Sequence, residues 1–384
     1  MVFEVEIERI LPGGMGLAHA GGKTVFVSLA APGDRLRVQV EREQGNVLFA
    51  SIVEVITPSP VRIEPPCPYF GRCGGCDFQQ LTYEAQLAAK SEMIRDCLHR
   101  IARLENVPDI VVTPSPNAWR YRMRAMWQMD QNERTIGYYE RGSRRVCDVV
   151  DCAVLRPELQ AQLEEVRATE WPQFPPDLKH LDVVAGEDGV SFAPAFAGFE
   201  TRELSLTVRG EVYRYNAESF FQINPSLLGP LIEFALGDAA GASALDLYSG
   251  VGLFTLPLSR QFQRVMAVEA NPTAVRFARR NLQDAGLPNT RVIVAGVAEW
   301  FRNAPVRDID FILLDPPRAG AESAVIKGIL DVHPKQISYV SCDPATLARD
   351  LKKLVAGGYR VESIMAFDLF PQTHHVETVV RLAV

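Results

Sequence analysis

The sequence lacks the features that mark several classes of protein. It has no uncharged apolar run approaching the roughly 18 residues that cross a bilayer, and its first residues, MVFEVEIE, lack the basic segment that begins a secretory signal. It also lacks an excess of basic residues, because 40 Lys and Arg stand against 47 Asp and Glu, for a formal net charge of -7. We therefore expect a cytoplasmic protein with no membrane partner that is not a general nucleic-acid coat.

Disulfide bonds are not expected either, because seven cysteines cannot all pair and a reducing compartment disfavours them. Three of the cysteines, Cys67, Cys73 and Cys76, fall within the stretch CPYFGRCGGC. We interpret this cluster as metal or redox ligands. Cys97, in contrast, lies in a segment from Tyr83 to about Leu104 with helical spacing of apolar residues, so we expect it in the core.

The 384 residues, 47% of them hydrophobic, suffice for two or three domains. To about residue 57, short alternating apolar runs are separated by turns such as PGGMG and APGD, which predicts a small antiparallel β-barrel. In the last third, apolar strands (ALDLY, RVMAVE, RVIVAG, DFILLD, ISYVSC) alternate with helical segments such as PTAVRFARRNLQDAG. This alternation predicts a doubly wound parallel sheet of the α/β class.

Ligands of such sheets lie beyond the carboxyl ends of the strands. One of these ends carries a Gly250-x-Gly252 turn, and Glu269 ends the next strand, where an acid can bind ribose hydroxyls. A nicotinamide site usually has a third glycine where this chain has Thr255. The pattern therefore favours a nucleoside without a pyrophosphate, such as S-adenosylmethionine.

Reactive side chains stand at further strand ends. Cys342 in YVSCDP is at the end of one strand and the start of a helix, where a thiolate is favoured, although a free cysteine can also be a small buried apolar residue. Asp315 in LLDPPRAG ends the neighbouring strand. Glu377 starts the last strand, and an antiparallel edge strand would return it to the same rim. We expect Glu269, Asp315, Cys342 and Glu377 to converge on one cleft.

A possible nucleic-acid contact lies in WRYRMRAMW. Arg120, Arg122 and Arg124 alternate there, so a strand would place them on one face, where they could meet phosphates while the neighbouring rings stack on bases. A solvated strand face explains the same pattern equally well.

Taken in order, the motifs FFQINPSLL, DLYSGVGLFTLPL, VEANPTAVRFARRN, LLDPPRAG, YVSCDPATLARDL and HHVETVVRL closely resemble the class I S-adenosylmethionine-dependent RNA uracil-C5 methyltransferases. GGMGLA, APGD and ASIVEVI resemble the TRAM RNA-binding barrel, and CPYFGRCGGC resembles the iron-sulfur motif of the family. The resemblance implies a Rossmann-like methyltransferase domain (residues 83–112 and 213–384), an N-terminal OB-like TRAM barrel (1–58) and a central α+β domain that binds the cluster and RNA (59–82 and 113–212).

The resemblance also implies roles for individual residues. Cys152 in VVDCAVL matches the fourth ligand of a four-iron four-sulfur cluster, and Cys147 falls outside that motif. Spacing alone would allow zinc, since four thiolates bind either metal. The implied cluster ligands are Cys67, Cys73, Cys76 and Cys152. The implied contacts to S-adenosylmethionine are Gln222, Tyr248, Glu269 and Asp315, with Cys342 as nucleophile and Glu377 as general base.

The implied partner is RNA, with 23S ribosomal RNA preferred over transfer RNA, and we expect a monomer. Two other classes keep part of the pattern: an iron-sulfur oxidoreductase that binds nicotinamide, and an RNA-binding protein without catalysis. The chain also departs from its relatives at three places. Asp343 follows the nucleophile where many relatives have asparagine, Val297 replaces a polar residue near the adenine, and YRMR replaces a common YRNK.

Overall fold

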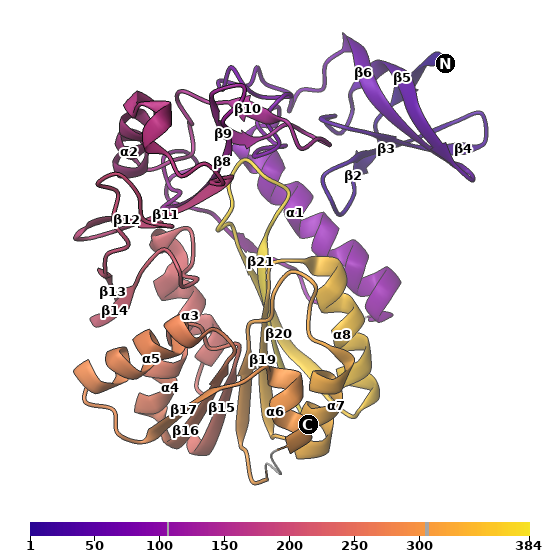
Figure 1. Cartoon of the computed structure of the whole chain (residues 1–384). Helices are drawn as coiled ribbons and strands as arrows, with labels where there is room; N and C mark the ends of the chain where they lie inside the picture. The colour runs from indigo at the N-terminus through magenta and orange to yellow at the C-terminus, as the bar shows by residue number, and fades with distance from the viewer. Residues whose placement is uncertain (106, 304–306) are drawn as a thin grey trace.

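In the computed structural model, residues 1–105, 107–303 and 307–384 are described. Three groups of strands follow one another along the chain, and Figure 1 shows the N-terminal and central groups at one end of the C-terminal sheet. Among the residues that the structure describes, none of the helices combines the length and the apolar character that crossing a bilayer requires.

The first group is the expected small β-barrel. Its strands lie in the order β1-β5-β6-β4-β3-β2, and alternate residues of β5, such as Leu36 and Val38, are buried in its core. One detail of the prediction is wrong, because β4 pairs with β6 in parallel while the other pairs are antiparallel. The strands are β1 (Val2–Glu6), β2 (Arg9–Ile10), β3 (Gly16–Ala20), β4 (Lys23–Val27), β5 (Arg35–Gln44) and β6 (Val47–Thr57).

The central group is an antiparallel sheet in the order β10-β9-β8-β11-β12, with helix α2 packed against β11 and β12. A hairpin, β13-β14, follows and leads into the C-terminal sheet. The elements are β8 (Arg124–Asp130), β9 (Thr135–Tyr139), β10 (Val146–Asp148), α2 (Pro157–Ala168), the 3-10 turn η2 (Trp171–Gln173), β11 (His180–Gly186), β12 (Gly189–Ala193), β13 (Leu204–Val208) and β14 (Glu211–Tyr215).

The strand face expected for Arg120, Arg122 and Arg124 is wrong. The backbone at Arg120 has a left-handed φ of 54°, and β8 begins only at Arg124. Arg120 pairs with Asp151 instead, while Nε of Arg122 donates to the carbonyl of Arg124. The three guanidinium groups therefore have different surroundings, because a left-handed residue breaks the alternation of an extended strand.

The third group is the expected α/β sheet, in the order β17-β16-β15-β18-β19-β21-β20-β7. The strands β15, β16, β17, β18 and β19 are parallel to one another, and β21 pairs antiparallel with both β19 and β20. Since β20 and β7 pair beyond it, β21 is not the edge strand that we expected. The strands are β7 (Val112–Thr113), β15 (Gly241–Leu247), β16 (Phe262–Glu269), β17 (Thr290–Val294), β18 (Phe311–Leu314), β19 (Gln336–Ser341), β20 (Arg360–Phe367) and β21 (Glu377–Ala383).

Helices cover both faces of this sheet, which explains why its strands are apolar throughout. Helices α3, α4 and α5 share one buried core with the central sheet, and α1, α6, α7 and α8 share a second core on the other face. They are η3 (Pro225–Leu227), α3 (Leu228–Leu236), α4 (Thr255–Gln261), α5 (Pro272–Asp284), α6 (Val297–Asn303), α7 (Ser323–Val332) and α8 (Pro344–Ala356).

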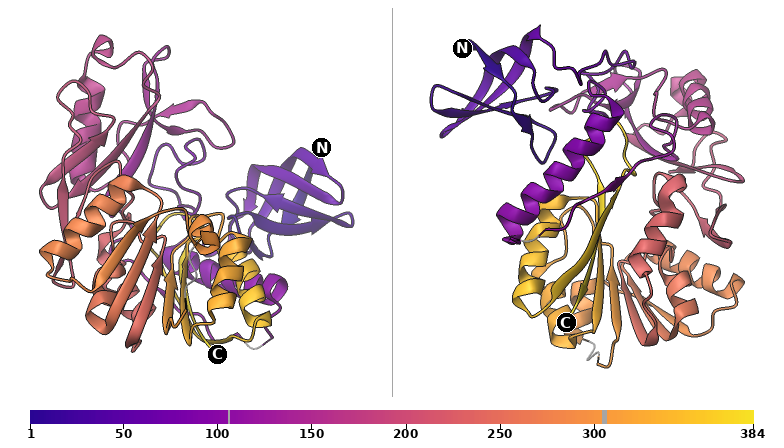
Figure 2. Two further views of the ribbon diagram at one scale, coloured as in Figure 1. Left: turned by 60° about the horizontal axis from the view of Figure 1, so that its bottom comes forward. Right: turned by 180° about the vertical axis from the view of Figure 1, so that it is seen from behind.

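Helix α1 (Tyr83–Cys97) begins at its N-cap Thr82 and continues into a π-helical turn, η1 (Leu98–Ala102). It packs against α8, and the right view of Figure 2 shows it running diagonally beside the C-terminal helices. Cys97 is 2% exposed and belongs to the core, as expected. The domain boundaries at residues 58, 82, 112 and 212 remain a prediction.

Candidate active site

A cleft of about 710 Å³ opens at the carboxyl ends of β15, β16, β18 and β19. Residues of the central sheet, including Arg124 and Met126, form another of its walls. The cleft is lined by every residue that the sequence analysis assigned to the nucleoside and to the chemistry: Gln222, Tyr248, Glu269, Asp315, Cys342 and Glu377. The structure thus brings these residues together, and their individual roles remain predictions.

The turn after β15 forms one end of the cleft. Gly250 and Gly252 both have left-handed φ values, of 55° and 97°, which suit glycine because it has no Cβ. Oε2 of Glu269 accepts a hydrogen bond from the backbone N–H of Gly250 (3.0 Å), and Oε1 accepts one from Asn271 (2.7 Å). Backbone donors therefore fix the Glu269 carboxylate, and its remaining lone pairs can accept hydrogen bonds from ribose hydroxyls.

Asp246, at the end of β15, was not singled out in the sequence, although it opens the motif DLYSGVG. It is completely buried, and among the described residues only one of its oxygens, Oδ2, has a hydrogen-bond donor, the hydroxyl of Thr255. Burial raises the pKa of Asp246 to about 7. An oxygen without a hydrogen-bond partner is unusual for a buried acid, although Asp246 is not among the residues that line the cleft.

Two further carboxyl groups lie in the wall of the cleft. Burial raises the pKa of Asp315 to about 7, and a hydrogen bond from Nε2 of Gln222 to its Oδ2 (3.3 Å) partly offsets this effect. Burial also raises the pKa of Glu377 well above its ordinary value, and the negative charge of Asp315 raises it further. Oε1 of Glu377 has no partner among the described residues, so this carboxyl group can receive a proton without breaking a hydrogen bond there.

Cys342 follows β19 directly, and its thiol faces these acids. Burial raises its pKa to about 12, and the charges of Glu377 and Asp315 contribute, while Arg318 lowers it, so the thiolate expected from the sequence is disfavoured here because the thiol is buried beside two acids. Asp343 contributes less than either acid. The carboxylate of Asp343 caps α8, accepting hydrogen bonds from the N–H groups of Ala345 (3.0 Å) and Thr346 (2.8 Å), and the helix N-terminus compensates its charge. Asparagine can cap a helix in the same way, so this departure from the relatives is mild.

The open side of the cleft carries aromatic and basic groups that sequence reasoning did not assign. Phe220 is 58% exposed although it is a large apolar side chain, and Phe370 lines the cleft as well. Arg318 lies at the rim and forms no ion pair within the described parts of the chain. The sequence held one indication of these two residues, namely their positions beside assigned site residues: Phe220 lies in FFQINP with Gln222, and Arg318 lies in DPPR with Asp315. Exposed rings and a free guanidinium group suit a base and a phosphate.

The four cysteines of the implied cluster line one small cavity in the central region: Cys67, Cys73, Cys76 and Cys152. Cys147 is buried in β10 and is not part of that lining. The backbone N–H of Gly75 donates to the sulfur of Cys73 (3.4 Å). Two polar atoms of residues in the lining, Oε1 of Gln79 and the hydroxyl of Tyr138, are buried without a partner among the described residues.

Among the residues that the structure describes, no three metal-binding side chains gather closely enough to hold one ion. A tetrahedral zinc site has Zn–S bonds of about 2.3 Å, which would bring its sulfurs within about 3.8 Å of one another. The described residues therefore show no assembled metal site here, and four thiolates as a donor set are compatible with zinc and with an iron-sulfur cluster alike.

Comparison with known proteins agrees with this geometry. A family model described as tRNA (uracil-5-)-methyltransferase matches residues 197–384, and a model of the tRNA (uracil(54)-C(5))-methyltransferase TRAM domain matches residues 3–61. An uncharacterised RNA methyltransferase of Bdellovibrio bacteriovorus is 31% identical over 99% of this chain and 95% of its own length. Another, from Thermotoga maritima, is 33% identical over 100% of this chain and 99% of its own length.

One solved structure is similar along its whole length. It is the Pyrococcus abyssi tRNA (uracil-54, C5)-methyltransferase in complex with S-adenosyl-L-homocysteine, with 25% sequence identity, a TM-score of 0.75, and coverage of 99% of this chain and 100% of that one. The relatives are described as RNA methyltransferases, the family models and the solved structure as uracil-C5 methyltransferases, and the solved structure contains S-adenosyl-L-homocysteine. The chain therefore belongs to the family of S-adenosylmethionine-dependent RNA uracil-C5 methyltransferases.

Proposed function

We propose that the enzyme methylates C5 of one specific uridine in a structured RNA through a covalent adduct between Cys342 and C6 of the base. The observation that carries this proposal is the meeting of Cys342, Asp315 and Glu377 in a cleft that also contains the nucleoside-binding turn. A duplex would bury the target, so the base comes from a loop or is flipped into the cleft, where Phe220 and Phe370 are placed to stack on it.

The chemistry explains why a thiol and an acid are both needed. C5 of uracil is a weak nucleophile. When the Cys342 thiolate adds to C6, the electron pair of the C5–C6 double bond becomes an enolate, and C5 becomes nucleophilic. Bound S-adenosylmethionine supplies the electrophilic methyl group. Glu377 then takes the proton from C5, the C5–C6 double bond forms again, and the electron pair of the C6–S bond returns to Cys342.

The surroundings of Glu377 suit this step. A carboxylate whose pKa is raised by burial and by the charge of Asp315 is a stronger base than an exposed one, which helps it to remove a proton from carbon. Its Oε1, without a partner among the described residues, is available for that proton. Burial and the charges of Glu377 and Asp315 raise the pKa of Cys342 to about 12, and the positive charge of Arg318 offsets part of that rise in favour of the thiolate.

For the cofactor, we propose that Glu269 binds the ribose hydroxyls, and that Gln222, Tyr248 and Asp315 form the rest of the S-adenosylmethionine site. Their position around one turn and one strand edge supports this assignment. Val297 is 4% exposed and packs in the core, so its side chain offers no hydrogen bond to the adenine. The adenine amine would then be held by backbone groups or by another side chain.

For the cysteines, we propose a four-iron four-sulfur cluster held by Cys67, Cys73, Cys76 and Cys152. Their common cavity and the backbone N–H donated to Cys73 support a shared thiolate site, and the sequence resemblance, rather than the geometry, favours a cluster over zinc. The methyl transfer includes no redox step, so we assign the cluster a structural role.

We propose two candidate RNA targets, in order of preference. The sequence resemblance to iron-sulfur family members favours a uridine of 23S ribosomal RNA. Transfer RNA is the second candidate, because the matched TRAM model and the similar Pyrococcus abyssi structure are both described as tRNA uracil-54 enzymes.

Mapping 5-methyluridine in the two RNAs, in a strain without this gene and in one with it restored, tests the proposal. We expect one site to lose its methyl group and to regain it. If purified enzyme with S-adenosylmethionine methylates neither RNA at C5 of uridine and binds nicotinamide stoichiometrically, the oxidoreductase alternative gains support.

A further inference from the structure

Residues 368–376 form a loop between β20 and β21, which we call the catalytic loop because it ends at Glu377. Phe370 of this loop lines the active-site cleft. The position of the proposed base is therefore tied to this loop, and the contacts of the loop decide how precisely Glu377 is held.

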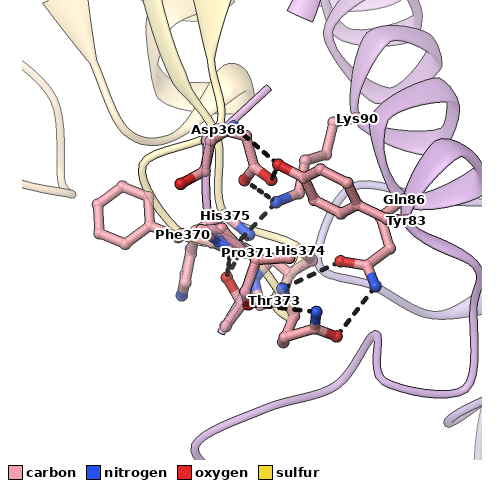
Figure 3. Close-up of polar contacts among 12 residues, drawn as sticks. Tyr83, Gln86, Lys90, Asp368, Phe370, Pro371, Thr373, His374 and His375 are labelled. Atoms are coloured by element: carbon pink, nitrogen blue, oxygen red, sulfur yellow. Dashed lines mark hydrogen bonds and ion pairs between the residues drawn. The ribbon is translucent and has the colours of Figure 1, made fainter. Parts of the chain in front are cut away.

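Helix α1 holds the start of the catalytic loop. Asp368 accepts hydrogen bonds from Nζ of Lys90 (2.5 Å) and from the hydroxyl of Tyr83 (2.8 Å), and Lys90 and Asp368 are both completely buried. Gln86 donates to Oε1 of Gln372 (3.0 Å) and accepts from its backbone N–H (3.0 Å). Figure 3 shows Tyr83, Gln86 and Lys90 projecting from the helix toward this loop.

The cysteine segment, residues 67–78, holds the end of the loop. Asp77, which follows Cys76 directly, accepts a hydrogen bond on Oδ1 from the backbone N–H of His374 (2.7 Å), and its Oδ2 contacts Nδ1 of the same histidine. The backbone N–H groups of Asp77 and Phe78 both donate to the carbonyl of Gln372 (3.1 and 3.0 Å). The segment that provides three of the proposed metal ligands thus contacts the loop beside Glu377.

The N-terminal barrel reaches the same point. Gly14 lies so close to His374 that an added Cβ would be 3.1 Å from the Cβ of the histidine. His374 therefore has the barrel on one side and Asp77 on the other, three residues before Glu377. Because His374 is held on both sides, a displacement of the cysteine segment would shift His374 and, through the chain that follows it, the general base Glu377.

We propose that Asp77 is a positioning residue for the reaction, which holds Glu377 in place through His374, and that the cysteine site supports proton removal in this way. This inference rests on the proposed role of Glu377. It assigns the cysteine segment a function in one step of the cycle. Methyl transfer depends on Cys342, on the cofactor and on the base, on which Phe370 of the loop is proposed to stack. Because Lys90 of α1 donates a hydrogen bond to the carbonyl of Phe370 (3.1 Å), that end of the loop is held without Asp77, and methyl transfer should be affected much less.

The test is a single-turnover reaction of the full chain with RNA and methyl-labelled S-adenosylmethionine. In Asp77→Ala, we expect labelled RNA to remain bound to the protein and free product to appear at least about tenfold more slowly, with cofactor affinity within about twofold of the parent. Asp77→Asn keeps an acceptor for the N–H of His374 and should recover part of the release rate. Iron content is measured in parallel, so that loss of metal is not mistaken for loss of positioning.

Glu140→Ala is the matched control. Glu140 accepts a hydrogen bond from Nε of Arg72 (2.8 Å), so it anchors the same cysteine segment to β9 and the adjoining turn without touching the catalytic loop. We expect this variant to release product within about twofold of the parent rate. Equal slowing in Glu140→Ala and Asp77→Ala would assign the effect to general loosening of the segment and overturn the inference.

Further outcomes separate the two proposals. If Glu377→Gln accumulates the adduct while Asp77→Ala releases product at the parent rate, Asp77 has no positioning role. If Asp77→Ala binds cofactor but transfers no methyl group, the contact serves an earlier step, and the inference is wrong. If Glu377→Gln itself accumulates no adduct, the proposed role of Glu377 is wrong, and the inference that rests on it is wrong as well.

Discussion

The hydroxyl of Thr255 donates a hydrogen bond to the buried carboxyl group of Asp246, at the position where the sequence lacks the third glycine of a dinucleotide site. A glycine there would leave Asp246 with no donor at either oxygen among the described residues. Thr255 therefore stabilises the structure of this turn by satisfying Asp246, in addition to any effect that the missing glycine has on which nucleotide binds.

This relationship predicts a pH-dependent stability. In the folded protein, burial raises the pKa of Asp246 from its ordinary value to about 7. The folded state therefore binds this proton more tightly than the unfolded chain does. The stability that this proton provides is complete below about pH 4 and is lost as the pH rises toward 7. Asp246→Asn keeps an acceptor for Thr255 and should raise the free energy of unfolding at pH 8 by roughly 1 to 3 kcal/mol, with little change at pH 4.

Denaturant unfolding of the ligand-free protein at the two pH values measures this effect. Asp177→Asn, at an exposed position, serves as the control and should change neither value by more than about 0.5 kcal/mol. A loss of stability in Asp246→Asn at pH 8 would show that the carboxylate is compensated in the fold, contrary to the expectation.

The covalent mechanism predicts different outcomes for the two reactive residues. Cys342→Ala should form no adduct and no product, because C6 is never attacked. Glu377→Gln should add to C6 and accept the methyl group but release product very slowly, because the C5 proton has no base. Denaturing gels should show RNA attached to protein that carries the methyl label and disappears on nuclease digestion. Normal turnover by Glu377→Gln, or an adduct in the double variant with Cys342→Ala, would refute these roles.

The cysteine cavity predicts a metal and a ligand set. Protein purified without oxygen should be brown and contain iron. Cys152→Ser should lose much of that iron because it removes a ligand in the cavity, whereas Cys147→Ser should retain it because Cys147 lies outside the lining. Metal analysis and visible absorbance measure both effects. Zinc in place of iron in anaerobic material would contradict the cluster.

The cofactor site predicts a change in affinity. Glu269→Ala removes the proposed ribose acceptor, a charge-assisted contact of about 1.5 to 3 kcal/mol, so the Kd for S-adenosylmethionine should rise roughly ten- to a hundredfold. Glu362→Ala, in an exposed position on β20, is the control and should leave the Kd unchanged. Calorimetry measures both, and an unchanged Kd in Glu269→Ala would place the ribose elsewhere.

Local sequence patterns predicted the α/β sheet and the position of the cleft. A parallel sheet places the carboxyl ends of its strands at one edge, so identifying strands by their apolar runs was enough to bring Gly250, Glu269, Asp315 and Cys342 together. The segment PTAVRFARRNLQDAG was also identified as helical from the sequence, and the structure has α5 over Pro272–Asp284 within it.

The tertiary structure alone decided the features that depend on contacts between distant residues. The pairing of β21 inside the sheet, the different surroundings of Arg120 and Arg122, and the contact of Asp77 with His374 follow no local period. The partners of that last contact are 297 residues apart, and either side chain would look like an ordinary surface residue in sequence. Local propensity specifies which strands and helices form, but only packing of the complete chain determines which of their ends meet.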